Sequence, residues 1–177
     1  MGTVGAPTFA LEEQNASLVH KNERVEKHGD EDKIACDIDF EMEVANTALA
    51  MFAPSLRSCL YQKDQGPQAD LPGTESPDHT PSLRFPALGK LKWAAGDLTG
   101  AELRFHGMDN KSDVVFDSAK VGKYRFECKE GGTVVIGFQA QVYPNEKQSG
   151  RLSKFLQDKV CQITVTPAPP PADLGAE

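Results

Sequence analysis

Residues 33–44 have the sequence KIACDIDFEMEV, in which a larger apolar side chain occupies every second position. The apolar members are Ile34, Cys36, Ile38, Phe40, Met42 and Val44. A period of two is typical of a β-strand with one buried side and one side facing solvent. Four of the five intervening residues are acidic, so the stretch predicts a strand whose outer face carries Asp37, Asp39, Glu41 and Glu43.

The flanking sequence extends this strand into a mainly β domain. Residues 28–32, HGDED, are rich in turn formers, so residues 24–44 are predicted to form a hairpin. Further strand-like segments lie at 83–93, 101–106, 113–117, 120–128, 133–143 and 160–166. Short turns between successive strands favour antiparallel pairing. The predicted fold is a mainly β antiparallel sandwich or partly open barrel of about seven or eight strands with one or two short helices.

Helical periodicity is confined to two regions of the chain. After residue 44 apolar side chains recur at three- and four-residue steps, and Pro54 divides this region into predicted pieces at 47–52 and 54–62. Asn145 and Gln148 form a capping box that opens a second helix. A single domain over 17–166 is expected, with a flexible N-terminus at 1–16, a mobile insert at 62–82 and a Pro-rich disordered tail at 167–177.

Charge is distributed unevenly along the chain, whose net charge is −7. Residues 1–80 carry fifteen acidic and six basic side chains, whereas residues 81–166 carry nine acidic and thirteen basic ones. Such asymmetry between halves is typical of a protein that binds a partner. The acidic face at residues 37–43 is one candidate contact surface. Its alternatives are a solvated face that limits aggregation and a metal or catalytic site.

The basic half alternates cations with aromatic rings, a combination that single-stranded nucleic-acid binders use. The candidate nucleic-acid contacts are Lys92, Trp93, Arg104, Lys123, Arg125, Arg151 and Lys154. On one strand, Lys123 and Arg125 share a face while Tyr124 and Phe126 share the other. The rings beside those cations are therefore expected in the core, and Trp93 and Tyr143 are freer to be exposed. A solvated basic face without a ligand is the alternative.

No catalytic motif stands out, so we expect a protein that is not an enzyme and needs no metal or cofactor. Asp113, Glu127 and Lys129 resemble the acidic-acidic-lysine pattern of metal-dependent nucleases, which a turn near Lys120 would bring together. A metal-dependent nuclease is the least favoured of the alternative functions. The four histidines lack a serine or cysteine partner in a recognisable setting, and no phosphate-binding glycine loop is present.

Cysteine usage and hydropathy indicate the compartment. Cys36, Cys59, Cys128 and Cys161 form no Cys-x-x-Cys pair and have no histidine at zinc-ligand spacing, so they are interpreted as small hydrophobes in a reducing cytoplasm. No run of about 18 apolar residues is present, and the first residues lack a secretory signal pattern. We therefore expect a cytoplasmic protein without membrane contact.

Three segments carry a family resemblance: VEKHGD at 25–30, LRFP at 83–86, and the stretch from Gly131-Gly132-Thr133 to PNEKQ at 144–148. Over about residues 20–167 the chain resembles a group of small proteins encoded in tailed-phage and prophage genomes. The resemblance implies synthesis in a bacterial host cell and a role in DNA metabolism, host takeover, defence evasion or the virion. It transfers no site residues, because no catalytic motif is attached to the group.

These observations predict a non-enzymatic phage-type binding protein, foremost a single-stranded nucleic-acid or DNA-metabolism accessory protein. One alternative is a protein–protein inhibitor of a host defence or nucleic-acid enzyme that uses the acidic hairpin. Another is a virion or assembly component. A homo-oligomer is compatible with each of these functions.

Overall fold

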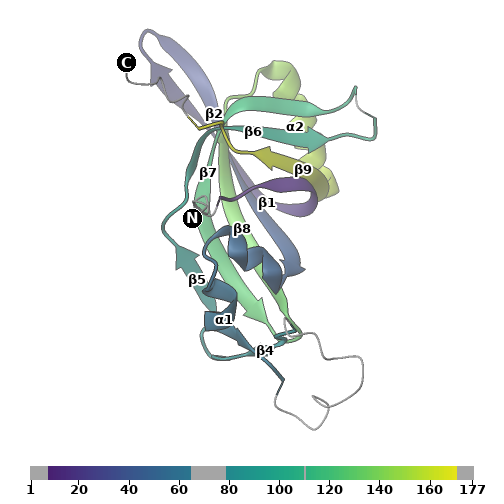
Figure 1. Ribbon diagram of the computed structural model, residues 1–177. Coiled ribbons are helices and arrows are strands. Elements are labelled where there is room, and N and C mark those ends of the chain that lie inside the picture. The colour runs from purple at the N-terminus through teal and green to yellow at the C-terminus, as the bar shows by residue number, and fades with distance from the viewer. Residues whose placement is uncertain (1–7, 65–78, 110, 171–177) are drawn as a thin grey trace, which may run out of the picture.

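The computed structural model shows a closed antiparallel barrel of six strands (Figure 1). It describes residues 8–64, 79–109 and 111–170. Around the barrel the order is β7 (Val114–Lys129), β6 (Leu98–His106), β9 (Val160–Thr166), β1 (Leu11–His28), β2 (Glu31–Ala45) and β8 (Thr133–Val142), which pairs back with β7. An extra strand, β5 (Lys90–Trp93), pairs with β7. The predicted mainly β, antiparallel class is confirmed.

The alternation of β2 places the core inside the barrel. Its apolar side chains at 36, 38, 40 and 42 are buried, whereas the four acidic side chains face outward. Phe40 stacks on Phe138 of the neighbouring strand with ring centroids 5.0 Å apart. It also meets Phe105, which belongs to β6, at 5.8 Å. A closed barrel leaves few strand edges unpaired, and its interior is filled by side chains from every strand.

Strand β1 is long because it pairs with two partners in succession. Residues 11–17 pair with β9, and residues 17–28 pair with β2 through a turn at Gly29, whose φ is 69°. The β1–β2 hairpin extends beyond the barrel (Figure 1) and carries the exposed cross-strand pair Val25 and Ile34. Residues 11–16, predicted to be flexible, are thus part of the barrel. A β-bulge around Glu13, with φ of 44°, removes the alternation that would have revealed this strand.

Strand β7 corrects a second prediction. The segments 113–117 and 120–128 are not separated by a turn near Lys120 but form one strand of 16 residues. Register shifts against β6 and β8 change which side chains point inward, so that Ala119, Val121 and Tyr124 are all buried. A bulge interrupts the period of a strand without ending it. The break in alternation that the bulge causes therefore resembles a turn in the sequence, although the strand continues.

The helices lie toward opposite ends of the barrel (Figure 1). At one end lie the 3₁₀ helix η1 (Asn46–Met51) and α1 (Leu56–Leu60), near the two pieces predicted around Pro54. At the other end α2 (Glu146–Asp158) begins with the predicted capping box of Asn145 and Gln148. Leu152 of α2 is fully buried, and Phe155 packs on Phe105 with centroids 5.4 Å apart. No helix among the described residues is long and apolar enough to cross a membrane.

Short strands occupy the region between α1 and β5. Only the ends of the predicted strand 83–93 are regular: β4 (Ser82–Leu83) pairs with β3 (Tyr61–Gln62), and residues 90–93 form β5. Most of the insert predicted at 62–82 and of the tail predicted at 167–177 falls at 65–78 and 171–177, outside the described residues.

Candidate functional site

The predicted acidic and basic surfaces form one mixed surface on the outside of the barrel. Strand β8 lies between β2 and β7, and its Gly137 has no side chain to separate them. The Arg125 guanidinium crosses over Gly137 and lies 3.9 Å from the Asp39 carboxylate. A second ion pair links the same two strands: Nζ of Lys129 lies 3.8 Å from the Glu43 carboxylate. The basic strand of the same chain therefore neutralises part of the acidic face of β2.

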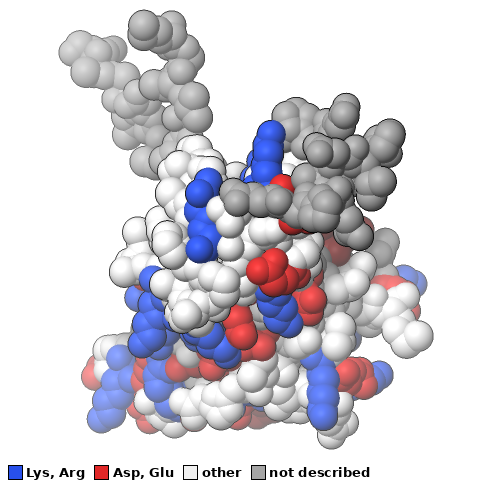
Figure 2. All heavy atoms as spheres, turned by 90° about the horizontal axis from the view of Figure 1, so that it is seen from below, with Lys and Arg blue, Asp and Glu red and all other residues white. Residues whose placement is uncertain are grey.

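The remaining charges repeat this pattern. Asp37 pairs with Arg24 of β1, and Glu41 shares a shallow depression with Arg125 and Lys90. Lys90 in turn lies 3.8 Å from Glu127. Figure 2 shows Lys/Arg and Asp/Glu side chains interspersed over the end of the barrel near α1 rather than gathered into separate patches. A phosphate backbone that approaches Arg24, Lys90, Arg125 or Lys129 would meet a carboxylate beside the cation.

The aromatic residues of the basic sheet point into the core. Tyr124 and Phe126 are buried, as the strand pattern predicts. Lys92 is exposed and stands opposite Arg125 across the β5–β7 ladder. Its neighbour Trp93, expected to be freer, is half-buried and packs against the rings of Phe52 and Phe126. The sheet thus presents its cations without the adjacent rings that stacking on bases requires.

The nuclease-like pattern is not assembled. Asp113 directly precedes β7, whereas Glu127 and Lys129 lie at the far end of that strand. Because β7 is continuous, no turn folds Asp113 back onto Glu127. Within the described residues, no group of three or more His, Cys, Asp and Glu side chains could hold a metal ion.

A cleft of about 820 Å³ lies between α2 and the connection from β6 to β7. Two of the predicted cations, Arg151 and Lys154, line it from α2. The opposite side consists of His106, Met108 and their neighbours, and the start of β9 closes one end. This volume is within the range of about 300–1,000 Å³ typical of small-molecule sites.

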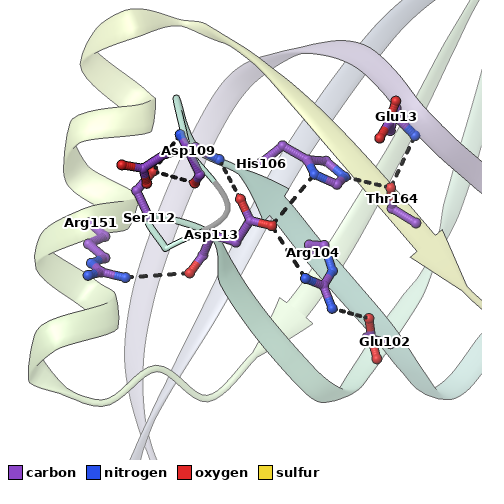
Figure 3. Close-up of polar contacts among 10 residues, drawn as sticks. Glu13, Glu102, Arg104, His106, Asp109, Ser112, Asp113, Arg151 and Thr164 are labelled. Atoms are coloured by element: carbon purple, nitrogen blue, oxygen red, sulfur yellow. Dashed lines mark hydrogen bonds and ion pairs between the residues drawn. The ribbon is translucent and has the colours of Figure 1, made fainter.

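Asp113 fixes the rim of this cleft (Figure 3). Its Oδ1 accepts a hydrogen bond of 2.9 Å from the Gly107 backbone N–H. Its Oδ2 accepts one of 3.3 Å from the Arg104 guanidinium and lies 3.7 Å from Nδ1 of His106. From α2, the Arg151 guanidinium donates to the Asp113 carbonyl oxygen at 3.4 Å. One residue therefore ties the β6–β7 connection to both β6 and α2.

The same contacts favour the ionised form of the Asp113 side chain. The Gly107 N–H, with smaller contributions from Arg104 and His106, holds the pKa of the Asp113 carboxyl below its ordinary value, against the opposing effect of burial. His106 is held from its other side, where Nε2 lies 2.7 Å from the Thr164 hydroxyl. That hydroxyl also accepts a hydrogen bond from the Glu13 N–H at 3.0 Å. The wall beneath the cleft is thus a connected polar network.

The cleft itself combines apolar surface with two available cations. Met108 is fully exposed at the rim, and Phe155 is half-buried in the lining. Among the described residues, neither Arg151 nor Lys154 takes part in an ion pair with a carboxylate. Asp109 and Asp158 also line the cleft, so it offers hydrogen-bond acceptors as well as cations.

The structure therefore divides the predicted nucleic-acid residues between two places. Arg151 and Lys154 line the cleft, and Arg104 supports it through Asp113. Lys92, Trp93, Lys123 and Arg125 lie on the sheet away from it. The contributions of His106 and Met108 to the cleft are not predicted by the sequence, because only the packing of α2 against the β6–β7 connection brings them opposite the helix.

The cysteines are not joined to one another. Cys36 and Cys161 are buried, and burial raises their thiol pKa values to about 11 and about 12. Cys128 is half-buried and Cys59 is exposed. The two buried thiols thus act as small hydrophobic side chains.

Comparison of the chain with protein-family models, with curated proteins and with solved structures gives no match.

Proposed function

We propose that the protein is a non-enzymatic, phage-type accessory protein of DNA metabolism that binds single-stranded nucleic acid in the cleft between α2 and the β6–β7 connection. The observation that supports this most is the placement of Arg151 and Lys154, two cations without carboxylate partners among the described residues, beside exposed apolar surface in this cleft. The phage context rests on the sequence resemblance alone.

The chemistry of the lining suits a nucleotide unit. Phosphates attract Lys and Arg side chains, and bases gain about 1–3 kcal/mol each by stacking on aromatic or apolar side chains. In the proposed complex the phosphate lies against Arg151 and Lys154, and the base covers Met108 and Phe155. Asp109 and Asp158 can accept hydrogen bonds from exocyclic amino groups, as acidic side chains do with cytosine.

The basic sheet is a weaker candidate for the same ligand. Arg125 and Lys129 lie against carboxylates of β2, and the neighbouring rings are in the core. A phosphate there would have to compete with carboxylates that are already in place. In the cleft, a phosphate would not have to displace a carboxylate from Arg151 or Lys154.

The proposal is tested by fluorescence anisotropy with a labelled single-stranded DNA of about 12 nucleotides, a length on the scale of known binding sites. The variant Arg151→Ala/Lys154→Ala should bind at least about tenfold more weakly. The slope of the logarithm of its binding constant against the logarithm of salt concentration should become less steep by about 1.4, because each phosphate contact on a single strand contributes about 0.7. Lys154 is exposed, and Arg151 gives up only one hydrogen bond of 3.4 Å to the Asp113 carbonyl oxygen, so thermal unfolding should change little.

The matched control is Lys27→Ala/Lys33→Ala, which removes the same charge from exposed positions of the β1–β2 hairpin that do not line the cleft. It should change affinity less than about threefold, because distant exposed charges are screened by salt. Equal losses in the two double variants would refute the cleft as the site. Absence of DNA binding by the unmodified protein at low salt would refute the function and favour docking to a host protein through the acidic hairpin, or a virion role.

A further inference from the structure

A second depression, of about 290 Å³, lies on the outer face of the barrel. Four strands and one loop contribute to it: β1, β2, β8, β7 and the segment between β5 and β6. Its polar lining includes Lys120, Lys123, Asp97, Gln139 and Gln141. None of these residues lines the cleft beside α2, so this is a separate site.

The backbone of β7 is distorted at this point. The register against β8 shifts between Gly122 and Arg125, and Lys123 has φ of 53°. A left-handed conformation is uncommon for a residue with a side chain, and strained residues of this kind cost about 1–3 kcal/mol and gather at ligand sites. The bulge sends Tyr124 into the core and leaves Lys123 exposed beside Gly122. It therefore adds a second ammonium group to the one from Lys120.

Gly122 forms part of the lining because a larger residue would not fit. A Cβ atom on Gly122 would lie 2.4 Å from Oδ1 of Asp97. The Asp97 carboxylate is thus positioned directly over the β7 backbone at the depression. Substitution of this glycine would displace the acceptor that the loop supplies.

The charges in the depression are not balanced. Arg24 is engaged by Asp37 and by Glu26, with the latter contact at 2.6 Å. In the part of the chain that the structure describes, no carboxylate lies within ion-pair distance of Lys120 or Lys123. Two ammonium groups therefore remain available on either side of Gly122.

Acceptor groups lie beside these ammonium groups. The Gln139 amide nitrogen donates to Asp39 at 3.2 Å, and the Gln141 amide nitrogen donates to Glu26 at 3.2 Å. Within residues 8–64, 79–109 and 111–170, neither side-chain carbonyl oxygen accepts a hydrogen bond, so both can do so, together with the carboxylate of Asp97. A ligand that matches this lining carries an anionic group at one end and hydrogen-bond donors at the other.

We propose that this depression binds a small phosphate monoester of mononucleotide size. The phosphate lies between Lys120 and Lys123, and hydroxyl or amino groups of the remainder donate to Asp97 and the two glutamine carbonyls. Its volume is near the lower end of the range for small-molecule sites, about 300 Å³. The proposal does not depend on DNA binding in the cleft.

Isothermal titration calorimetry with adenosine monophosphate, inorganic phosphate and adenosine tests the site. Adenosine monophosphate should bind most tightly, phosphate more weakly, and adenosine not measurably. The variant Lys123→Asn should bind adenosine monophosphate at least tenfold more weakly and remain folded, because asparagine tolerates the left-handed conformation. The variant Arg151→Ala/Lys154→Ala, altered only at the cleft, should bind it normally.

Lys33→Asn is the matched control, since it makes the same change at an exposed position of the β1–β2 hairpin. No heat of binding from adenosine monophosphate or phosphate at millimolar concentration would overturn the proposal. Unchanged affinity in Lys123→Asn, or an equal loss in Lys33→Asn, would do the same. Equal affinity for phosphate and adenosine monophosphate would overturn the role given to the acceptor groups.

Discussion

Replacement of Phe40 by alanine should lower the free energy of unfolding by about 3–5 kcal/mol, the range measured for large-to-small changes of buried aromatic residues. Phe40 is fully buried at the middle of β2. Its ring stacks on Phe138 and reaches Phe105, so its loss leaves a cavity between neighbouring and distant strands of the barrel. A domain with ordinary stability of about 5–15 kcal/mol would be close to unfolding after this change.

Urea denaturation followed by circular dichroism measures this loss. Phe85→Ala is the control, because it makes the same chemical change at a side chain that is 60% exposed. Exposed substitutions of this kind usually change stability by less than about 0.5 kcal/mol. A loss below about 1 kcal/mol for Phe40→Ala, or similar losses for both variants, would mean that the alternation in β2 does not build the core.

Asp113→Ala should have the next largest effect, a loss of about 2–3 kcal/mol, because hydrogen bonds to a charged group are each worth about 1.5–3 kcal/mol and the partners left behind are unsatisfied. The change removes the acceptor of the Gly107 N–H and one of the two carboxylates that pair with Arg104, which keeps Glu102. It should also weaken DNA binding, since the β6–β7 rim of the cleft is no longer tied to β6. Urea denaturation and DNA anisotropy measure the two effects.

The pH dependence of this loss identifies its cause. The pKa of Asp113 is lower in the folded state than in the unfolded state, so its stabilising contribution is complete above the unfolded value, near 4, and is lost as pH falls through the folded value. The difference between the unmodified protein and Asp113→Ala should therefore be constant from about pH 7 to pH 5 and shrink in stronger acid. Asp113→Asn, which keeps an acceptor for Gly107, should lose less. A difference that is unchanged at low pH would show that the charge of Asp113 is not involved.

Much of the fold could be predicted because β2 and β8 keep an unbroken local pattern. The strands that were misplaced contain bulges: Glu13 hides the start of β1, and the irregular stretch around Lys123 divides the pattern of β7. A bulge changes the phase of the side chains by one residue while the hydrogen-bonded ladder continues. In β7 the bulge is visible in the sequence as two buried apolar residues, Val121 and Tyr124, that are three positions apart instead of two.

The candidate site was less predictable, because the sequence shows where charges occur along the chain and not what faces them. Acidic β2 and basic β7 are far apart in sequence, yet they lie on either side of β8, and Gly137 lets Arg125 reach Asp39. What looked like two charged surfaces is therefore largely one neutralised surface. Arg151 and Lys154 were identified by their charge, but their cleft depends on long-range packing of α2 that no local pattern encodes.

The most direct test of the central claim is a two-dimensional ¹H–¹⁵N NMR titration of the protein with single-stranded DNA. The account requires the largest shifts at residues 104–109, 112 and 151–162, which surround the cleft and its support. Arg125, Lys129 and the β5 strand should change little. Shifts concentrated on β5 and residues 125–129, with the cleft unchanged, would contradict the account and place the ligand on the mixed-charge sheet.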